Sequence, residues 1–521
     1  MKLTYPFDNF YEILEKNTRE SPKKVTIYSE YGKLTNQELQ AQVDKTARFL
    51  EISNIKFGDK VGIVMSNGPQ FIVSLFAICK IGAIAVPINN FLKSEELEYI
   101  INNSDAKLLF ASGSFKGELK TVLQNTKVSK IIWSENQDNL DEDNFCMQEI
   151  LSGINIHHTT SRTPNLDDTA VIIYTSGTTG NPKGAMLSYK NLFSNSIAGT
   201  QRFKFTPKDR FIVYLPMFHS FTLSVMIIVP IFSNAAIVSI KSIFPFANVL
   251  KQALLKRVTV FLGAPQIYNA LNKAKVPWYF MWFNSIRLFV SGSAPLSEQV
   301  LVDFNKKFKR SIMVEGYGLS ECSPAVSSNL FDKRKVLSVG LPFVSYQVKI
   351  VDDDIMEVAT GTVGEIIVAG DCVMQAYYNN PTATDDTIVN GWVRTGDLGY
   401  VDEDGYIFIV DRKKDLIISK GVNVYPREIE ELIIKIDGVD AVAVVGIKDE
   451  TKDEKIVAFV ELEKETTKLV DERLIKEHIK PHLANFKMPK QIYFVDELPK
   501  NAANKVLKRK LKEDINQYIK S

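Results

Sequence analysis

The chain has 521 residues, of which 45% are hydrophobic and 24% are charged, a balance that excludes a largely disordered protein. Its 63 basic and 61 acidic residues leave a formal charge of +2, so the overall basic excess usual in nucleic-acid binders is absent. At roughly 150 residues per domain, the length predicts about three or four structural units.

The cysteines and the apolar stretches indicate the compartment. Four cysteines without CxxC spacing suggest buried free thiols in a reducing environment. The first residues contain acids and no apolar run, which argues against a signal peptide. Residues 211–240 are strongly apolar, but Pro216 and Pro230 interrupt them, so buried strands and a helix are expected there rather than a membrane span. A cytoplasmic location is therefore predicted.

In the first half of the chain, short apolar runs alternate with amphipathic stretches. We predict helices over 70–81 and 94–103, and strands over 60–66, 84–89, 107–112, 130–133, 257–264 and 285–292. Alternation of this kind builds parallel sheets that helices cover.

Beyond these segments the pattern changes twice. Between about 340 and 410, short strands separated by Gly, Asp and Asn predict an antiparallel β unit. After Arg412, strands and a helix over 471–486 predict a small α+β domain. The predicted fold class is therefore α/β: a large N-terminal domain of α/β subdomains with a small β unit, followed by a small α+β domain.

The strongest local signal is a glycine-rich segment that follows the apolar strand at 171–174. Glycines without Cβ let backbone N–H groups approach phosphate oxygens, while hydroxyls and a lysine add donors and charge. The spacing differs from GxxxxGK[ST]. The candidates for phosphate contact are Thr175, Ser176, Gly177, Thr178, Thr179, Gly180 and Lys183.

The string YTSGTTGNPKG resembles the phosphate-loop signature of the adenylate-forming superfamily, which includes acyl-CoA synthetases, firefly-type luciferases and peptide-synthetase adenylation domains. Other segments resemble the family's motifs in the family's order: GYGLSECSP (316–324), WVRTGDLGY (392–400), SKGVNVYPREIEE (419–431) and LPKNAANKVLKRKL (498–511). The resemblance implies an N-terminal adenylation domain at 1–411 for ATP and the acyl substrate. It also implies a mobile C-terminal domain at 412–521 with a hinge at 412–414.

The resemblance assigns nucleotide roles residue by residue. Tyr317 would stack on adenine, and Glu321 would hold Mg²⁺ together with Thr175, in a loop that also contains Gly318 and Ser320. Ser320 stands where the family usually has Thr, and the change keeps the hydroxyl.

Two further segments complete the implied nucleotide site. Asp397 would accept hydrogen bonds from the ribose hydroxyls, and Arg412 would contact the ribose and phosphate region. The loop at 290–298 matches the family's adenine-side loop, which contributes Gly292, Ser293 and Ala294.

His219 lies in the segment that the family places beside the reacting carboxylate. Amino-acid-activating relatives have an Asp there, so α-amino acids are disfavoured as substrates, because a buried ammonium group without a carboxylate is costly. A structural histidine in the core is the alternative.

The remaining implied roles belong to the mobile domain. Lys414 would be the hinge, and Gly421 would let the pantetheine arm of CoA pass close to the backbone. Lys505 is the candidate for the family's catalytic lysine, although Asn504 replaces the usual preceding Gly.

The implied reaction converts a carboxylic acid and ATP into acyl-AMP and then, with CoA, into acyl-CoA, with Mg²⁺ as the metal. DRKKDLI and NVYPREIE resemble the long-chain fatty-acid–CoA ligases, which favours a medium- or long-chain fatty acid. The alternatives are an acyl-AMP ligase that loads an acyl carrier protein, an aryl or short-chain acid–CoA ligase, and a non-enzymatic homologue with a decayed site. The sequence leaves a homodimer and peripheral membrane contact open.

Overall fold

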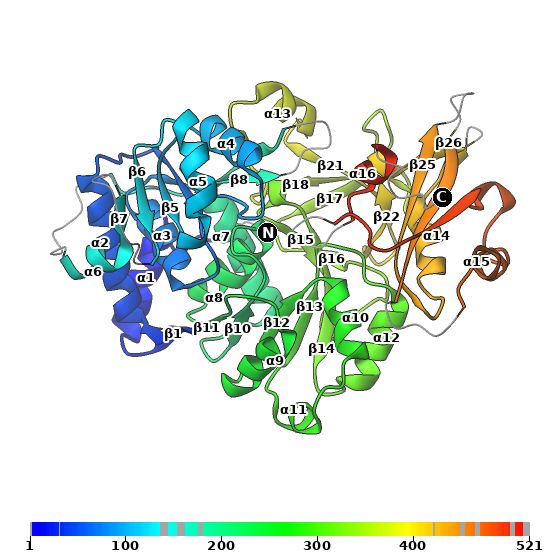
Figure 1. Ribbon diagram of the computed structural model, residues 1–521, viewed down its shortest axis with the longest axis horizontal. Helices are drawn as coiled ribbons and strands as arrows, with labels where there is room; N and C mark the ends of the chain where they lie inside the picture. Colours follow the sequence, from blue (N-terminus) through cyan, green and yellow to red (C-terminus); the bar gives the residue numbers. More distant parts are fainter. Residues whose placement is uncertain are drawn as a thin grey trace.

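Two large sheets with helices between and around them form most of the molecule, and a smaller lobe carries the C-terminal residues (Figure 1). The computed structural model describes residues 3–30, 32–135, 144–153, 162–175, 181–419, 422–448, 454–463, 469–500 and 506–513. The predicted fold class is confirmed: a large α/β part precedes a small α+β part.

The first sheet follows the order β19-β9-β8-β4-β3-β5-β6-β7, with parallel pairing from β8 to β7 and antiparallel pairing of β9 and β19 at one edge. Its strands are buried on both faces, as parallel strands covered by helices are: Val61 and Ile63 enter the central core, while Val64 enters the outer one. The strands are β3 (Lys60–Val64), β4 (Ile84–Pro87), β5 (Ala106–Ala111), β6 (Lys130–Trp133), β7 (Asn144–Cys146), β8 (Thr169–Thr175), β9 (Lys183–Ser188) and β19 (Ala376–Tyr377).

The second sheet follows the order β16-β15-β14-β13-β12-β10-β11-β1-β2, and its strands from β14 to β1 pair in parallel. Phe211 faces the central core and Ile212 faces a separate outer core, so this sheet too is covered on both sides. The strands are β1 (Val25–Ser29), β2 (Gly32–Thr35), β10 (Arg210–Val213), β11 (Ala236–Ser239), β12 (Val260–Gly263), β13 (Leu288–Ser291), β14 (Ile312–Gly318), β15 (Ala325–Ser328) and β16 (Leu341–Pro342).

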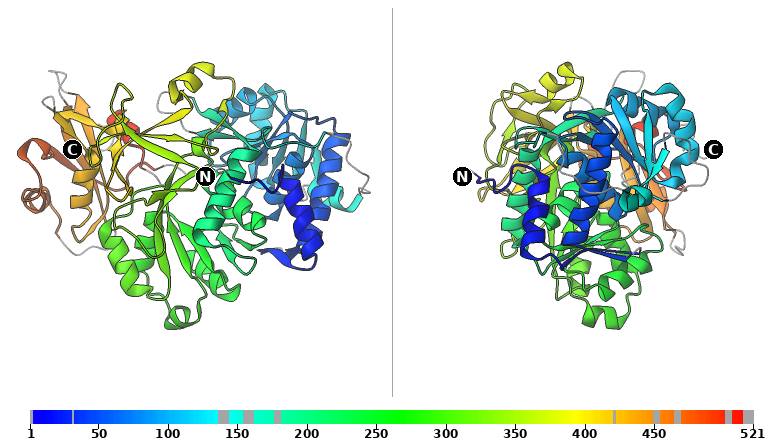
Figure 2. Two further views of the ribbon diagram at one scale, coloured as in Figure 1. Left: turned by 180° about the vertical axis from the view of Figure 1, so that it is seen from behind. Right: turned by 90° about the vertical axis from the view of Figure 1, so that its left-hand side faces the viewer.

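Helices between the two sheets share one hydrophobic core, and others cover the outer faces (Figure 2). Residues 211–240 form two buried strands, a π-helix (Thr222–Ile228) and α8, as expected, and none of the helices in the described ranges is long and apolar enough to cross a membrane. The helices are α1 (Phe10–Glu20), α2 (Asn36–Ile52), α3 (Pro69–Lys80), α4 (Ser94–Asn103), α5 (Lys116–Val122), α6 (Met147–Gly153), α7 (Tyr189–Phe203), α8 (Val229–Phe232), α9 (Phe246–Leu255), α10 (Pro265–Lys273), α11 (Trp278–Phe283) and α12 (Glu298–Lys307).

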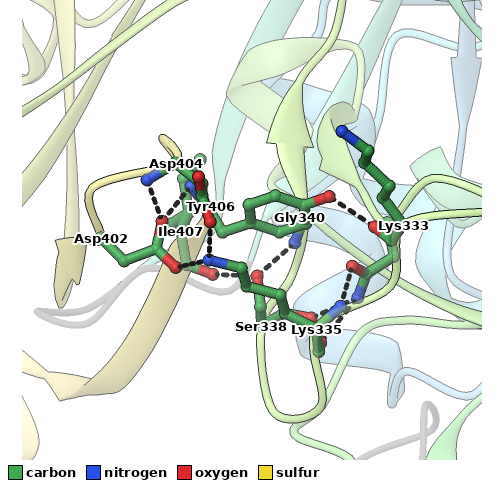
Figure 3. Close-up of polar contacts among 9 residues, drawn as sticks. Lys333, Lys335, Ser338, Gly340, Asp402, Asp404, Tyr406 and Ile407 are labelled. Carbon is green, nitrogen blue, oxygen red and sulfur yellow. Dashed lines mark hydrogen bonds and ion pairs between the residues drawn. The ribbon is translucent and has the colours of Figure 1, made fainter.

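The predicted antiparallel unit is a third sheet made of β17 (Gln347–Val351), β18 (Gly364–Ala369), β20 (Ile388–Val389), β21 (Trp392–Val401) and β22 (Ile407–Arg412), with α13 (Pro381–Thr387) beside it. The segment before β16 ties the β21–β22 hairpin to the second sheet (Figure 3). There Lys335 forms ion pairs with Asp402 and Asp404, and the hydroxyl of Ser338 donates to the Ile407 carbonyl at 2.9 Å. These contacts fix the strand that carries Asp397.

The C-terminal lobe contains β23 (Ile417–Ser419), β24 (Val422–Val424), α14 (Pro426–Ile433), β25 (Val439–Lys448), β26 (Glu454–Leu462), α15 (Glu472–Ile479), β27 (Gln491–Val495) and α16 (Lys508–Glu513). The helix predicted over 471–486 is wrong in length, because α15 ends at Ile479. Pro481 lacks a backbone N–H and its ring collides with the preceding turn, so the helix cannot continue through it.

Candidate active site

Three of the predicted site segments follow parallel strands of the second sheet. His219 comes after β10, Gly292 comes directly after β13, and Tyr317 lies near the end of β14. The carboxyl ends of parallel strands meet at one edge, which is where open α/β sheets bind ligands. The hydroxyl oxygens of Ser220 and Ser320 lie 2.8 Å apart, so the His219 segment and the turn after β14 are in direct contact.

Two glycines lie at this edge, and Gly318 is sterically constrained whereas Gly292 has room for a Cβ. A Cβ on Gly292 would lie 3.7 Å from the Phe221 ring, so the adenine-side loop and the His219 segment are close neighbours. A Cβ on Gly318 would lie 1.9 Å from the carbonyl oxygen of Pro324, which only glycine avoids. Next to Gly292, Ser293 is exposed with a φ of 68° and Ala294 is partly exposed.

Glu321 and Thr175, the two residues predicted to bind metal, lie together. Glu321 is in a short 3₁₀ turn (Ser320–Cys322), and its Oε1 accepts hydrogen bonds from the hydroxyl of Tyr377 at 2.7 Å and from that of Thr175 at 3.5 Å. Burial and the neighbouring Glu321 raise the pKa of Tyr377 well above its usual range, so its hydroxyl stays protonated and donates. The Nζ of Lys183 lies 5.3 Å from the centre of the Tyr377 ring.

Tyr377 is a site residue that the sequence analysis missed. It lies in β19, which pairs antiparallel with β9 and so brings a residue from position 377 back to the strand that follows the glycine-rich loop. No local pattern around Tyr377 marks it, because the pairing spans about 190 residues of sequence.

The predicted nucleotide contacts Tyr317, Asp397 and Arg412 form one connected group. The hydroxyl of Tyr317 donates to Oδ2 of Asp397 at 2.7 Å, and Nε of Arg412 lies 3.1 Å from Oδ1. Asp397 and Arg412 are paired residues of β21 and β22. Burial raises the pKa of Tyr317 well above its usual range, so it remains a donor. A carboxylate has about four lone-pair positions, so Asp397 can accept further hydrogen bonds from a ligand.

The predicted hinge lies in a 3₁₀ turn (Lys413–Asp415) that follows β22. Lys414 is exposed, as a hinge position requires. Its neighbour Lys413 forms ion pairs with Asp353 at 2.7 Å and with Glu365 at 3.2 Å. The large part of the molecule therefore holds the chain firmly just before the C-terminal lobe begins.

Helix α14 makes polar contacts to the large part of the molecule. The backbone N–H of Arg427 donates to Oδ2 of Asp411 at 2.9 Å, and Nη1 of Arg427 donates to the Ile409 carbonyl at 2.7 Å. Arg427 also faces the buried Glu315 in the middle of β14, whose pKa burial raises to about 8. These contacts were not predicted, because they depend on how the lobe is placed.

Some predicted residues lie outside the described ranges: Ser176, Gly177, Thr178, Thr179, Gly180, Gly421 and Lys505. The structure therefore brings together the described nucleotide and metal candidates on both sides of the glycine-rich loop, and the roles of all the predicted site residues stay predictions. Among the described residues, no group of three or more His, Cys, Asp or Glu side chains is arranged so that it could hold a metal ion. All four cysteines lie in the described ranges, and they are buried and form no disulfide.

Comparison with known proteins identifies the family. Residues 14–378 match the sequence profile of the AMP-binding enzyme family, and residues 428–505 match that of the AMP-binding enzyme C-terminal domain. The long-chain-fatty-acid–CoA ligase of Salmonella typhimurium is 33% identical over 509 residues, covering 92% of this chain and 90% of that protein. The enzyme of the same name from Bacillus subtilis is 31% identical over 550 residues, covering 100% and 97%. The 2-succinylbenzoate–CoA ligase of a Geobacillus strain is 32% identical, covering 95% of each.

Solved structures agree over nearly the whole chain. ATP-bound MatB from Rhodopseudomonas palustris superposes with a TM-score of 0.88 at 30% identity, covering 98% of this chain and 100% of that one, whereas apo MatB gives 0.78 at the same identity and coverage. The anthranilate CoA ligase AuaEII in complex with anthranoyl-AMP gives 0.90 at 26% identity, covering 99% and 98%. The chain therefore belongs to the AMP-binding enzyme family, together with these acid–CoA ligases.

Proposed function

We propose that the protein activates a carboxylic acid with ATP and transfers the acyl group to CoA. In the first step a carboxylate oxygen attacks the α-phosphorus of ATP, acyl-AMP forms and pyrophosphate leaves. In the second step the CoA thiolate attacks the acyl carbon, the thioester forms and AMP leaves. The observation that carries the proposal is the convergence of the Thr175–Glu321 pair and the Tyr317–Asp397–Arg412 group at the carboxyl edges of the strands.

The Tyr317–Asp397–Arg412 group is suited to the adenosine half of the nucleotide. Asp397 is buried and held by Tyr317 and Arg412, so its carboxylate is fixed in position while it retains free lone pairs for two ribose hydroxyls. Arg412 adds a fixed positive charge toward the phosphate side. Tyr317 offers a ring face for the purine while its hydroxyl is occupied by Asp397.

The Thr175–Glu321 pair fits a magnesium ion bound mainly through phosphate. Mg²⁺ prefers oxygen ligands and is commonly held by one or two carboxylates plus substrate phosphates. Glu321 supplies a carboxylate and Thr175 a hydroxyl, and Tyr377 orients that carboxylate through a 2.7 Å hydrogen bond. When bound, Mg²⁺ offsets negative charge on the polyphosphate.

The first step joins two anions, so the site must supply positive charge where the carboxylate meets the α-phosphate. Lys183 lies beside Tyr377 at the end of the glycine-rich loop, and Lys505 is the proposed bridge between the carboxylate and the nucleotide. His219 follows β10 at the same edge and is the proposed neighbour of the acyl carboxylate; its segment contacts the Glu321 turn through Ser220.

We further propose that the two steps use different placements of the C-terminal lobe. The higher TM-score with ATP-bound MatB than with apo MatB supports a placement that resembles the ATP-bound state of that relative. Rotation about Lys414 would then withdraw Lys505 and bring the Gly421 segment to the acyl-AMP, a gating step of the kind that moving domains provide.

The acid proposed is a medium- or long-chain fatty acid. Support comes from the relatives named long-chain-fatty-acid–CoA ligase, while the Geobacillus relative acts on 2-succinylbenzoate by its name and an Amycolatopsis relative is named feruloyl-CoA synthase. Aryl acids are therefore the second candidate class. The four buried cysteines, none of which forms a disulfide, support the proposed cytoplasmic location.

The test is a pyrophosphate–ATP exchange panel of short, medium and long fatty acids and of aryl acids, followed by thioester assays with CoA and with a holo acyl carrier protein. We expect exchange with longer fatty acids and product with CoA. The Asp397→Asn variant is the control, because it loses the ribose acceptor charge while keeping the shape of the side chain. Exchange with aryl acids alone would refute the fatty-acid preference, and product with the carrier protein alone would refute CoA as the acceptor.

A further inference from the structure

Helix α11 exposes an unusual concentration of aromatic side chains. Four of its six residues are large and exposed: Trp278 by 72%, Tyr279 by 47%, Trp282 by 70% and Phe283 by 68%. Phe280 is buried in the outer core of the second sheet, and Met281 is partly buried against it. The helix lies at the lower tip of the molecule in Figure 1 and again at the bottom of both views in Figure 2. We call these four exposed side chains the α11 patch.

Such a surface is costly for a protein that meets only water. Exposed apolar patches of this kind mark interaction surfaces, whereas isolated exposed apolar residues are ordinary. Tryptophan and tyrosine combine an apolar ring with a polar group, and this makes them common where a protein meets the boundary between lipid and water.

The surroundings of the α11 patch are strongly basic. Exposed cations lie on the segments around it, namely Lys251, Arg257, Lys275, Lys309 and Arg310, and residues 251–283 contain no acid. One of these cations contacts the helix directly, because Nη1 of Arg310 donates to the Trp282 carbonyl at 2.7 Å. A cationic surface with aromatic side chains at its centre is complementary to an anionic one that has an apolar interior.

The sheet explains why the charges gather there. β12, β13 and β14 are parallel neighbours, so the residues that precede them emerge at one edge. Arg257 precedes β12, Phe283 precedes β13, and Lys309 and Arg310 precede β14. This amino edge is opposite the carboxyl edge that carries the candidate active site.

We propose that the α11 patch and its basic surroundings dock the protein peripherally on an anionic phospholipid bilayer. The aromatic rings enter the boundary between headgroups and acyl chains, while the lysines and arginines attract the anionic headgroups. A second copy of the chain is a poor occupant, since a symmetric contact would bring the same exposed cations, Lys251, Lys275 and Lys309 among them, together. Docking through the amino edge leaves the candidate active site facing away from the membrane.

The test is co-sedimentation of the full-length protein with vesicles of phosphatidylcholine, with or without about 30% phosphatidylglycerol. We expect binding to the anionic vesicles that weakens as salt is raised, and about tenfold or greater loss of binding for the triple variant W278S/W282S/F283S. The matched control is I52S/M356S/L469S, which removes three exposed apolar side chains (61%, 65% and 85% exposed) elsewhere on the surface and should bind as the parent does.

A second variant tests the contribution of the charges. It also shows whether loss of binding by the aromatic variant could result from a folding defect. K251E/K275E/K309E reverses three exposed cations near the helix without touching the aromatic rings, and we expect it to lose both vesicle binding and salt dependence. Tryptophan fluorescence of the parent should shift to the blue on vesicle addition, because two of the four tryptophans lie in the α11 patch. Pyrophosphate–ATP exchange should be unchanged in all variants.

Three results would overturn the proposal. One is equal sedimentation with neutral and anionic vesicles, and another is unaltered binding by both the aromatic and the charge variants. The third is self-association of the parent without lipid that W278S/W282S/F283S abolishes, which would assign the α11 patch to contact between copies.

Discussion

The buried Glu315 makes the stability of the protein depend on pH. It lies in the middle of β14 with only 7% of its surface exposed, and Arg427 and Glu431 of α14 face it. Burial raises the pKa of Glu315 from 4.5 to about 8, with an opposing effect from Arg427 and a smaller raising effect from Glu431. We therefore expect Glu315→Gln, which is neutral at every pH, to stabilise the protein increasingly as the pH rises.

The sign and size follow from linkage. Between pH 4.5 and pH 8 the folded protein holds a proton that the unfolded chain has released, so the free energy of unfolding falls as pH rises, by up to about 1.4 kcal/mol per pH unit. From pH 5 to pH 7 the loss attributable to Glu315 is about 2.5 kcal/mol, and it is complete above pH 8. The Gln variant lacks this loss.

The assay is the midpoint of the first thermal unfolding transition, measured for parent and variant at intervals from pH 5 to pH 8. The difference, variant minus parent, should grow steadily with pH. The control is Glu431→Gln, which removes the smaller raising effect and should change the pH dependence in the same direction but less. A difference that stays constant with pH would refute the argument that Glu315 is neutral in the folded protein.

Three further predictions concern the candidate site. Tyr377→Phe removes the donor to Glu321 and should lower kcat/KM for pyrophosphate–ATP exchange by roughly thirtyfold, since a hydrogen bond to a charged group contributes about 2 kcal/mol. Gly318→Ala places a Cβ 1.9 Å from the Pro324 carbonyl and should destabilise the fold by about 2–4 kcal/mol, seen as a lower unfolding midpoint. Lys505→Ala should abolish acyl-AMP formation while sparing CoA thioester formation from supplied acyl-AMP.

Each of these three predictions has its own control or refuting result. Tyr378→Phe is the matched control for Tyr377→Phe, because the Tyr378 hydroxyl donates to Asp105 rather than to Glu321. Its loss should leave pyrophosphate–ATP exchange intact. Normal stability of Gly318→Ala would mean that the loop around Pro324 shifts freely. Undiminished acyl-AMP formation by Lys505→Ala would remove that lysine from the proposed chemistry.

Local patterns in the sequence were enough to predict most helices and strands and the order of the site segments along the chain. The strands around 60–66 and 107–112 were predictable because branched and aromatic residues mark buried parallel strands without reference to distant residues. The helix predicted over 471–486 is too long, because α15 ends at Ile479, just before Pro481, although apolar residues continue beyond the proline. The end of a helix can depend on a single residue, and here Pro481 determines where α15 ends.

The site was less predictable where it depends on pairing across the chain. Glu321 and Asp397 stood in motifs, but the hydroxyls that hold them come from Tyr377 and Tyr317, through contacts that span 56 and 80 residues. Tyr317 was expected from its ring face alone, and its hydroxyl proved to be engaged as well. Contacts of this kind arise from strand register, which a local pattern does not contain.

The near-neutral charge of the chain conceals a division that matters for both proposals. Residues 241–310 carry a net of +9 and the rest of the chain a net of −7, and the exposed Arg257, Lys309 and Arg310 precede β12 and β14 at the amino edge of the second sheet, where we expect long-range attraction of an anionic surface. Binding of ATP and CoA at the candidate site is expected to depend on short-range partners such as Arg412 and Lys183, which salt screens less than exposed distant charges. Vesicle binding should therefore weaken steeply as salt is raised, while activity on a water-soluble acid changes little. If both fell together with salt, the two edges would not be electrostatically separate.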